Sequence, residues 1–499
     1  MTSRVSKAGS RTMTAAFVAT LGACAVGPDF KRPDAPQAQS YTATPLPART
    51  VAAKGAAGKV QTFQHGAEIP AQWWTLFHSE KLNALVEQAL QSNQDVVAAQ
   101  AALRQAHENA LAQEGSYFPS FDGSGNVTRQ KISGASFGQP GAGGAIYSLF
   151  NASVNVSYTL DVWGGVRRGV EAQRAQAEYQ NFQLEGTYLT LTSNVVTTAV
   201  QEASLRAQID ATGQIIDADR KQLEVVKRQF VLGAVSKIDV LTQQSQLANV
   251  MATLPPLRKQ LAQNRDLLAV LLGRLPSEQP QQRFELDDLK LPEDLPVSLP
   301  SSLVGQRPDV RAQEALLHQA SAEIGVATAN MLPQLTISGS YGGTSTNISD
   351  LLKSASNVWS IGGGITQPLF HGGELLHKKR AAVAAYDQAA AKYRGTVLSA
   401  FQNVADTLHA LDADAEALQA EDQAADAAAE ALELARTQYQ AGSISNLNLL
   451  VSMRQYQQAR IAQLQAQAAR YADTAALFQA LGGGWWNRQN GAVAVNDKR

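Results

Sequence analysis

The stretch "FNASVNVSYTLDV", from Phe150 to Val162, alternates between apolar and polar residues over its whole length. A period of two is typical of a β-strand that has one apolar and one polar face. Such strands form the wall of an outer-membrane barrel, with lipid outside and water inside, and they also form soluble sheets with one wet face. The apolar positions are the even-numbered ones: Phe150, Ala152, Val154, Val156, Tyr158, Leu160 and Val162.

Three more segments are candidate strands. Leu335–Tyr341 alternates likewise, whereas Phe121–Lys131 and Trp359–Leu369 alternate more weakly because glycines replace some apolar residues. Strands of about 9 to 11 residues are long enough to cross a membrane in a barrel. Four strands do not close a membrane barrel, since the smallest ones need about eight. The sequence therefore predicts that several chains share one barrel.

The chain contains two copies of one unit of about 200 residues. Ser92–Ala106 matches Gln306–Ala320 at an offset of 214 positions, and Arg228–Leu241 matches Thr437–Leu450 at an offset of 209. The offset falls by five between these two blocks. We therefore expect the first copy to be slightly longer, most simply in a loop.

Long helical patterns surround the strands in each copy. In the first copy they run from about Glu80 to Glu114 and from about Val166 to Leu232, where a turn leads into a returning helix. At 1.5 Å per residue the longer helix would extend roughly 100 Å, with its tip that far from the barrel. Pro255 and Pro256 should kink or restart the returning helix. Heptad spacing predicts coiled-coil packing, as at Ile209, Ile216, Leu223 and Phe230.

The N-terminus has the layout of a bacterial lipoprotein signal. Basic residues precede the apolar run Thr12–Leu21, and "LGAC" then ends at Cys24, the only cysteine of the chain. This segment resembles a lipobox, in which the cysteine is acylated after cleavage; the alternative is an ordinary signal peptide with an incidental cysteine. Ala25 follows the cysteine at the position where inner-membrane lipoproteins often have aspartate, so the resemblance implies the outer membrane as the destination. Residues 31–70 are expected to form an extended arm.

Composition excludes little by itself. The 42 basic and 43 acidic residues give a net charge of −1, which does not favour nucleic acid or any strongly charged partner. After Cys24 we find no apolar window long enough for a transmembrane helix, so membrane insertion would have to use strands. "HGGELLH" (His371 to His377) lacks the order of a zinc-protease motif, and no catalytic cluster is recognisable. We expect no enzyme activity, no metal and no cofactor.

Three segments carry a resemblance to a known family: "CAVGPDFKRP" after the lipobox, "LPSSLVGQRPDVRAQE" (Leu299 to Glu314) and "ALGGGWW" (Ala480 to Trp486). With the duplication, they resemble the TolC-like outer-membrane factors of the NodT/OprM lipoprotein group, the exit ducts of tripartite efflux pumps. The resemblance implies a trimer with a twelve-stranded outer-membrane barrel, four strands per chain, continued by a periplasmic coiled-coil tunnel. It also implies a periplasmic adaptor and an inner-membrane pump, of the RND type, as partners.

The resemblance also implies functional residues at the ends of the long helices. Gly233 and Gly442 suit helix C-caps, and Ser236 and Ser445 suit N-caps of the returning helices. The family docks adaptors at these tips, although capping alone would explain all four residues.

The segment "NLNLLVSMRQ", just after the second tip, resembles the constriction of the family. This places Leu447 and Arg454 at the periplasmic gate. Val451 stands where relatives often have aspartate, so the resemblance does not extend to a ring of carboxylates at position 451, and Asp239 is the remaining acidic candidate. An arginine near a threefold axis needs an acid or carbonyl to offset like-charge repulsion.

The predicted organisation has five parts: a signal peptide (1–23), a lipidated arm (24–79), repeat one (80–297), repeat two (298–484) and a tail (485–499). The expected function is export of small toxic compounds or drugs. Alternatives are a periplasmic coiled-coil adaptor lipoprotein, which would have one hairpin and no membrane strands, and an exit duct for protein secretion.

Overall fold

The computed structural model describes residues 25–133, 138 and 144–488, so Cys24 lies outside the described residues. The described residues form two compact units. The first takes the described residues within 25–32, 104–179 and 313–393, and the second those within 33–103, 180–312 and 394–488. Among the helices described, none combines the length and the apolar composition that a membrane crossing requires.

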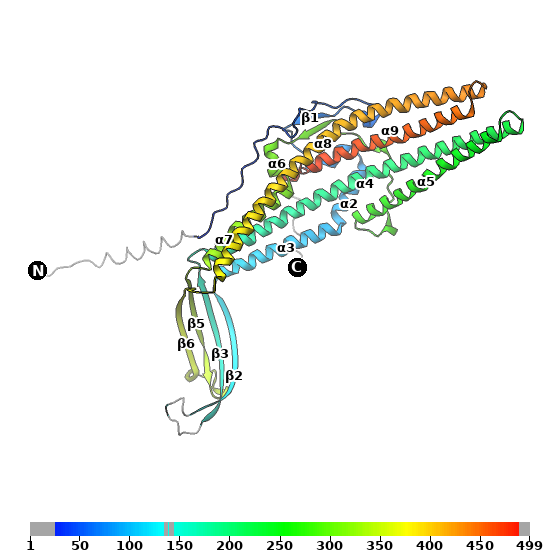
Figure 1. The fold of residues 1–499 in the computed structure, drawn as a ribbon. Coiled ribbons are helices and arrows are strands. Elements are labelled where there is room, and N and C mark those ends of the chain that lie inside the picture. Colours follow the sequence, from blue (N-terminus) through cyan, green and yellow to red (C-terminus); the bar gives the residue numbers. More distant parts are fainter. Residues whose placement is uncertain (1–24, 134–137, 139–143, 489–499) are drawn as a thin grey trace. The chain divides into compact units, whose positions relative to one another are not determined.

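The first unit contains one antiparallel sheet of four strands in the order β2-β3-β5-β6 (Figure 1). Each strand overlaps a segment whose alternation predicted it, although the ends differ by up to five residues. The strands of the two repeats meet at the central pair, β3 and β5. The bounds are β2 (Ser120–Ile132), β3 (Ala145–Leu160), β5 (Gln334–Ser345) and β6 (Asn357–Thr366).

The register of the sheet collects apolar side chains on one face. Rows of paired residues run across all four strands, and alternate rows point to the same face. The opposite face is polar, with Ser124 Oγ and Ser153 Oγ 3.0 Å apart. Two successive apolar rows are Phe121–Val156–Gly339–Ile361 and Gly123–Val154–Tyr341–Trp359, and their large side chains at positions 121, 154, 341, 359 and 361 are exposed in the single chain.

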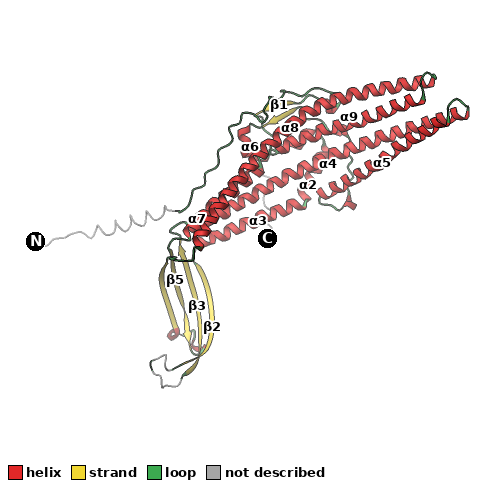
Figure 2. Ribbon diagram, in the orientation of Figure 1, coloured by secondary structure: helices red, strands yellow, loops and turns green. Residues whose placement is uncertain are grey.

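Two pairs of long antiparallel helices are the largest helical elements (Figure 2). They are α4 (Gly165–Val231) with α5 (Lys237–Leu271), and α8 (Glu374–Gln440) with α9 (Asn446–Ala480). Every boundary of α8 and α9 lies 209 positions after that of α4 and α5. The shorter helices are α2 (Glu80–Ser92), α3 (Gln94–Glu114), α6 (Pro300–Gln306) and α7 (Pro308–Ala329).

Two details differ from the sequence-based expectation. The extra length of the first repeat lies mainly in a strand rather than in a loop, since β3 has 16 residues and β6 has 10. Helix α5 continues through Pro255 and Pro256, so the restart does not occur, while the kink stays a prediction. The two prolines remove the donors that would bond the carbonyls of Met251 and Ala252. Both of these residues are exposed, so water can satisfy their carbonyl groups.

The N-terminal arm has more structure than its composition predicted. In the second unit, β1 (Thr62–His65) pairs in parallel with β4 (Asp294–Val297), and this small sheet was not predicted. The fully buried Arg470 of α9 holds the same arm, donating to the Ala57 carbonyl at 2.9 Å and to Gln61 Oε1 at 2.8 Å. Short 3₁₀ turns are η2 (Ala56–Gly58), η3 (Trp73–Phe77), η4 (Gly115–Tyr117), η6 (Pro276–Glu278), η7 (Leu286–Asp288), η8 (Ile348–Asp350), η9 (Ser354–Ser356) and η10 (Trp485–Asn487).

Candidate functional site

Both long hairpins turn at a glycine with a left-handed backbone. Gly233 and Gly442 each have φ of 74°, a conformation that costs glycine little. At the first tip the Gly233 amide donates to the Phe230 carbonyl at 2.9 Å, and the Ala234 amide donates to the Gln229 carbonyl at 2.8 Å. The equivalent residues of the second tip make the same two bonds. These are the two bonds of a Schellman motif, so the predicted C-cap geometry is present at both tips.

The returning helices begin at the predicted serines. Ser236 Oγ accepts from the Asp239 amide at 3.3 Å, and the Asp239 carboxylate accepts from the Ser236 amide at 2.9 Å. This reciprocal pair is a capping box. Ser445 Oγ accepts from the Asn448 amide at 3.4 Å, without a carboxylate to return the bond. The Asp239 carboxylate is therefore held at the start of α5, while the role of the tips in adaptor contact stays a prediction.

The predicted gate residues occupy one exposed face of α9. Leu447 is 60% exposed, and Val451 and Arg454 are also exposed. Their spacing of four and three residues places them above one another on the helix. Within the part of the chain that the structure describes, Arg454 has no ion-pair partner. A partner for this charge must therefore come from solvent or from another molecule.

The opposite face of α9 packs into a core that joins the two hairpins. Leu449, Leu450 and Met453 are at most 5% exposed. Because the exposed and buried residues alternate along the same turns, the packing of this core fixes the direction in which the predicted gate face points. The core consists of Leu223, Val226, Val240, Leu432, Ala435, Tyr439, Leu449, Leu450 and Met453.

Two polar contacts link the hairpins beside this core, and the sequence analysis did not identify them. Tyr439 Oη donates to Gln229 Oε1 at 2.7 Å, and the buried Asn446 donates through Nδ2 to the Asp239 carbonyl at 3.5 Å. Burial, followed by the charge of Asp239, raises the pKa of Tyr439, so its hydroxyl remains a donor at neutral pH. A signal was available, because Tyr439 stands at the repeat position of Phe230 and differs from phenylalanine only by its hydroxyl.

A buried carboxylate lies farther along α4, next to a cavity between α4 and the α8–α9 hairpin. Asp219 is fully buried, and among the described residues neither of its carboxylate oxygens has a hydrogen-bond partner. Burial raises its pKa from the ordinary 3.8 to about 6, although the charge of Arg436 opposes this shift. The cavity measures about 430 Å³, and its lining includes Arg460 and Tyr456. Ionisation of the buried Asp219 carboxylate therefore lowers the free energy of unfolding, and this loss depends on pH.

Comparison with known proteins gives consistent matches over nearly the whole chain. The sequence profile described as "Outer membrane efflux protein" matches residues 85–274 and 299–483. The pyoverdine export outer membrane protein OpmQ of Pseudomonas aeruginosa is 30% identical over 427 residues, which cover 84% of this chain and 89% of that protein. The toluene efflux pump outer membrane protein TtgC of Pseudomonas putida is 28% identical over 469 residues, 94% of each protein.

Solved structures show the same fold. The outer-membrane channel OprN superposes with a TM-score of 0.82 at 28% identity, covering 93% of this chain and 100% of that chain. The CmeC outer membrane channel of Campylobacter jejuni superposes with a TM-score of 0.84 at 22% identity, covering 94% and 96%.

Proposed function

Because the chain belongs to the outer membrane efflux protein family, we propose that it is the exit duct of a tripartite pump, fed by a periplasmic adaptor and an inner-membrane transporter. The family and the fold class predicted from the sequence are confirmed, and the protein is an outer-membrane efflux channel. The observation that carries the proposal is the joining, in one chain, of a four-stranded amphipathic sheet to two long helical hairpins. We further propose that the transporter is of the RND type.

Three chains close the barrel. In the sheet order β2-β3-β5-β6, strands β2 and β6 each have one unpaired edge among the described residues. Pairing β2 of one chain with β6 of the next removes these edges, and three copies supply twelve strands. The apolar face of the sheet then contacts lipid, and the polar face lines the water-filled interior.

A matched pair of lysine substitutions tests this orientation. Val154 lies on the apolar face and Asn155 on the polar face of the same strand. Lysine at a lipid-facing position near the bilayer midplane costs about 2–4 kcal/mol, whereas the lumen tolerates charge. We expect Val154→Lys to lower the amount of heat-resistant trimer in outer-membrane fractions severalfold and Asn155→Lys to leave it near wild type. Equal loss in both variants would contradict the assignment of the faces.

We place the gate at the exposed α9 face. Three copies of Leu447, Val451 and Arg454 around a threefold axis give an apolar ring followed by a ring of positive charge. Since Asp239 is held in its capping box, Arg454 is expected to pair with a carbonyl or acid of a neighbouring chain. With valine at position 451, no carboxylate ring that binds cations is expected at this level.

We also propose that Cys24 carries the lipid anchor. The anchor adds to a barrel that already holds the protein in the outer membrane, while the helical hairpins extend into the periplasm. Two or three acyl chains give stable anchoring where one is marginal. Cys24→Ser should abolish incorporation of labelled palmitate, and label retained in the variant would contradict the assignment.

Small toxic compounds or drugs are the proposed cargo, and the inner-membrane pump selects among them. The relatives' names mention pyoverdine, toluene and cations, which share little chemistry. The test is deletion of the gene and measurement of minimal inhibitory concentrations for antibiotics, toluene and metal cations. Wild-type protein should restore resistance, and Val154→Lys should not. Unchanged sensitivity to every compound after deletion would contradict an efflux role.

A further inference from the structure

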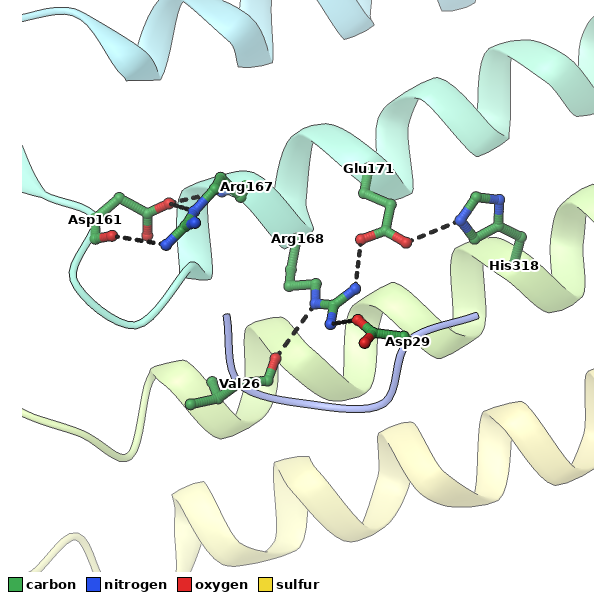
Figure 3. Close-up of polar contacts among 7 residues, drawn as sticks. All are labelled: Val26, Asp29, Asp161, Arg167, Arg168, Glu171 and His318. Atoms are coloured by element: carbon green, nitrogen blue, oxygen red, sulfur yellow. Dashed lines mark hydrogen bonds and ion pairs between the residues drawn. The ribbon is translucent and has the colours of Figure 1, made fainter. Parts of the chain in front are cut away.

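The first described residues of the chain, Ala25–Arg32, bind across the parts of helices α4 and α7 that belong to the first unit (Figure 3). We refer to this segment as the strap. Its Val26 amide donates to the Trp163 carbonyl at 2.9 Å, and Arg168 Nε donates to the Val26 carbonyl at 3.3 Å. The backbone of the strap is therefore fixed on both sides, next to the turn that joins β3 to α4.

Arg168 of α4 is the centre of this contact. Its side chain is only 6% exposed and reaches Asp29 at 2.6 Å through Nη2 and Glu171 at 2.7 Å through Nη1. Glu171 also contacts His318 Nε2 of α7 at 2.9 Å. Because a buried guanidinium needs several partners, loss of the strap would leave Arg168 with the Glu171 contact and without two of its acceptors.

A second group of contacts holds the strap on α7. The Phe30 ring stacks on the His318 ring with centroids 4.4 Å apart, and Arg32 pairs with Glu314 at 3.0 Å. Helix α4 belongs to the first repeat and α7 to the second. The strap therefore bridges the two copies of the duplicated unit.

The surface under the strap requires a glycine at position 325. A Cβ added there would lie 2.7 Å from Arg168 Cγ and 2.8 Å from the Val26 carbonyl oxygen. On the strap, a Cβ at Gly27 would lie 2.5 Å from the Gly325 Cα. Gly325 lies inside helix α7, where alanine is the better helix former. The glycine is thus explained by the close approach of the strap and not by the helix.

We propose that α4 and α7 form a binding site for the strap, and that the bound strap holds the turn between β3 and α4. The same turn is secured from the second repeat, because Trp163 Nε1 donates to the Pro333 carbonyl at 2.7 Å. The site binds an extended segment that presents one backbone carbonyl, one carboxylate and one aromatic ring. Occupation of the site gives the chain after Cys24 a fixed position at the strand–helix junction, whether or not Cys24 is acylated.

The test uses trypsin cleavage at Lys31 of the full protein in detergent, followed by mass spectrometry. A protease needs a free extended segment, so a bound strap is cut slowly. Gly325→Ala should speed cleavage at least tenfold and should also speed amide exchange in residues 161–166. Gly213→Ala is the matched control, because Gly213 lies in α4 with no heavy atom within 4 Å of an added Cβ. Unchanged cleavage in Gly325→Ala, or faster cleavage without faster exchange, would overturn the proposal.

Three further variants show whether the side chains of α4 and α7, rather than the lipid, hold the strap. Arg168→Ala should release the strap to the same extent, while Arg174→Ala removes an exposed pair with Glu114 and should change nothing. Cys24→Ser, exported with an ordinary cleavable leader, should keep slow cleavage at Lys31. Fast cleavage in that variant would mean that the lipid, and not α4 and α7, holds the segment, and would overturn the proposal while leaving the lipidation proposal intact.

Discussion

The hairpins α4–α5 and α8–α9 share every helix boundary at an offset of 209 positions, but their side chains differ at equivalent positions. The backbone of the duplicated unit was thus retained while its surface and its polar contacts changed. The residues of the proposed gate face stand in the second copy, whereas, among the described residues, Asp219 of the first copy is the acid with both carboxylate oxygens buried and without a hydrogen-bond partner. The equivalent pairs are Ile238 and Leu447, Thr242 and Val451, Ser245 and Arg454, Phe230 and Tyr439, and Asp219 and Ala428.

The largest expected effect comes from removing the gate face of the second hairpin. Leu447→Ala combined with Arg454→Ala should widen the aperture, because both the apolar ring and the charged side chains that hold it are lost. We expect a severalfold rise in single-channel conductance in planar bilayers and entry of vancomycin into cells that carry the variant.

The first hairpin supplies the control for this experiment. Ile238→Ala combined with Ser245→Ala makes the equivalent changes on α5 and should leave both measurements near wild type. If the α9 variant forms normal amounts of trimer and yet changes neither conductance nor vancomycin sensitivity, the constriction lies elsewhere.

The buried acid of the first hairpin should make stability depend on pH. The folded chain holds the Asp219 proton up to about pH 6, whereas the unfolded chain releases it near pH 4. The contribution of Asp219 to the free energy of unfolding therefore falls as the pH rises from about 4 to about 6. Asp219→Asn should stabilise the protein at pH 7.5 by at most about 3 kcal/mol and should have little effect at pH 4.

Thermal unfolding at pH 4 and at pH 7.5, followed by the circular dichroism of the helices, measures this difference. Asp217→Asn is the control, since Asp217 is exposed and pairs with Arg220 on the helix surface. A stabilisation of equal size at both pH values would show that the charge of Asp219 is not its cause.

The sequence predicted the elements whose signals are local. The long helix expected at Val166–Leu232 is found at Gly165–Val231, because glycine and serine caps mark its end within a few residues. The sheet of β1 and β4 was missed, because each strand has four residues and its partner lies more than 200 positions away. The contact between Tyr439 and Gln229 was missed because comparison of the repeats marks only the extra hydroxyl of Tyr439, and no local pattern specifies its partner in the other hairpin.

A moderate loss of stability is expected when Tyr439 is replaced by phenylalanine, the residue type at the equivalent position of the first hairpin. Tyr439→Phe removes the hydrogen bond to Gln229 and should destabilise the contact between the hairpins by about 1 kcal/mol. A double-mutant cycle with Gln229→Ala, read from thermal midpoints, isolates this coupling. Phe230→Tyr is the reverse substitution at a partly exposed position and should be neutral. Strictly additive effects in the cycle would show that the hydrogen bond contributes nothing.

The smallest effect concerns the two N-caps. Ser236 belongs to a reciprocal capping box and Ser445 does not, so Ser236→Ala should cost more than Ser445→Ala, each within about 0.5–2 kcal/mol. Amide exchange in the first turns of α5 and α9 measures both losses. Equal protection in the two variants would show that the Asp239 carboxylate does not strengthen the cap.

A substitution at Ser445 tests whether this residue only caps helix α9 or also contacts the adaptor. Aspartate caps a helix about as well as serine, so Ser445→Asp should keep the amide protection of α9. It also adds a negative charge at the exposed end of the hairpin. If the tip contacts the adaptor, affinity measured with the purified adaptor should fall at least threefold while stability is unchanged. If affinity is retained, Ser445 serves only to start the helix, and the difference between the hairpins is then confined to the gate face of α9.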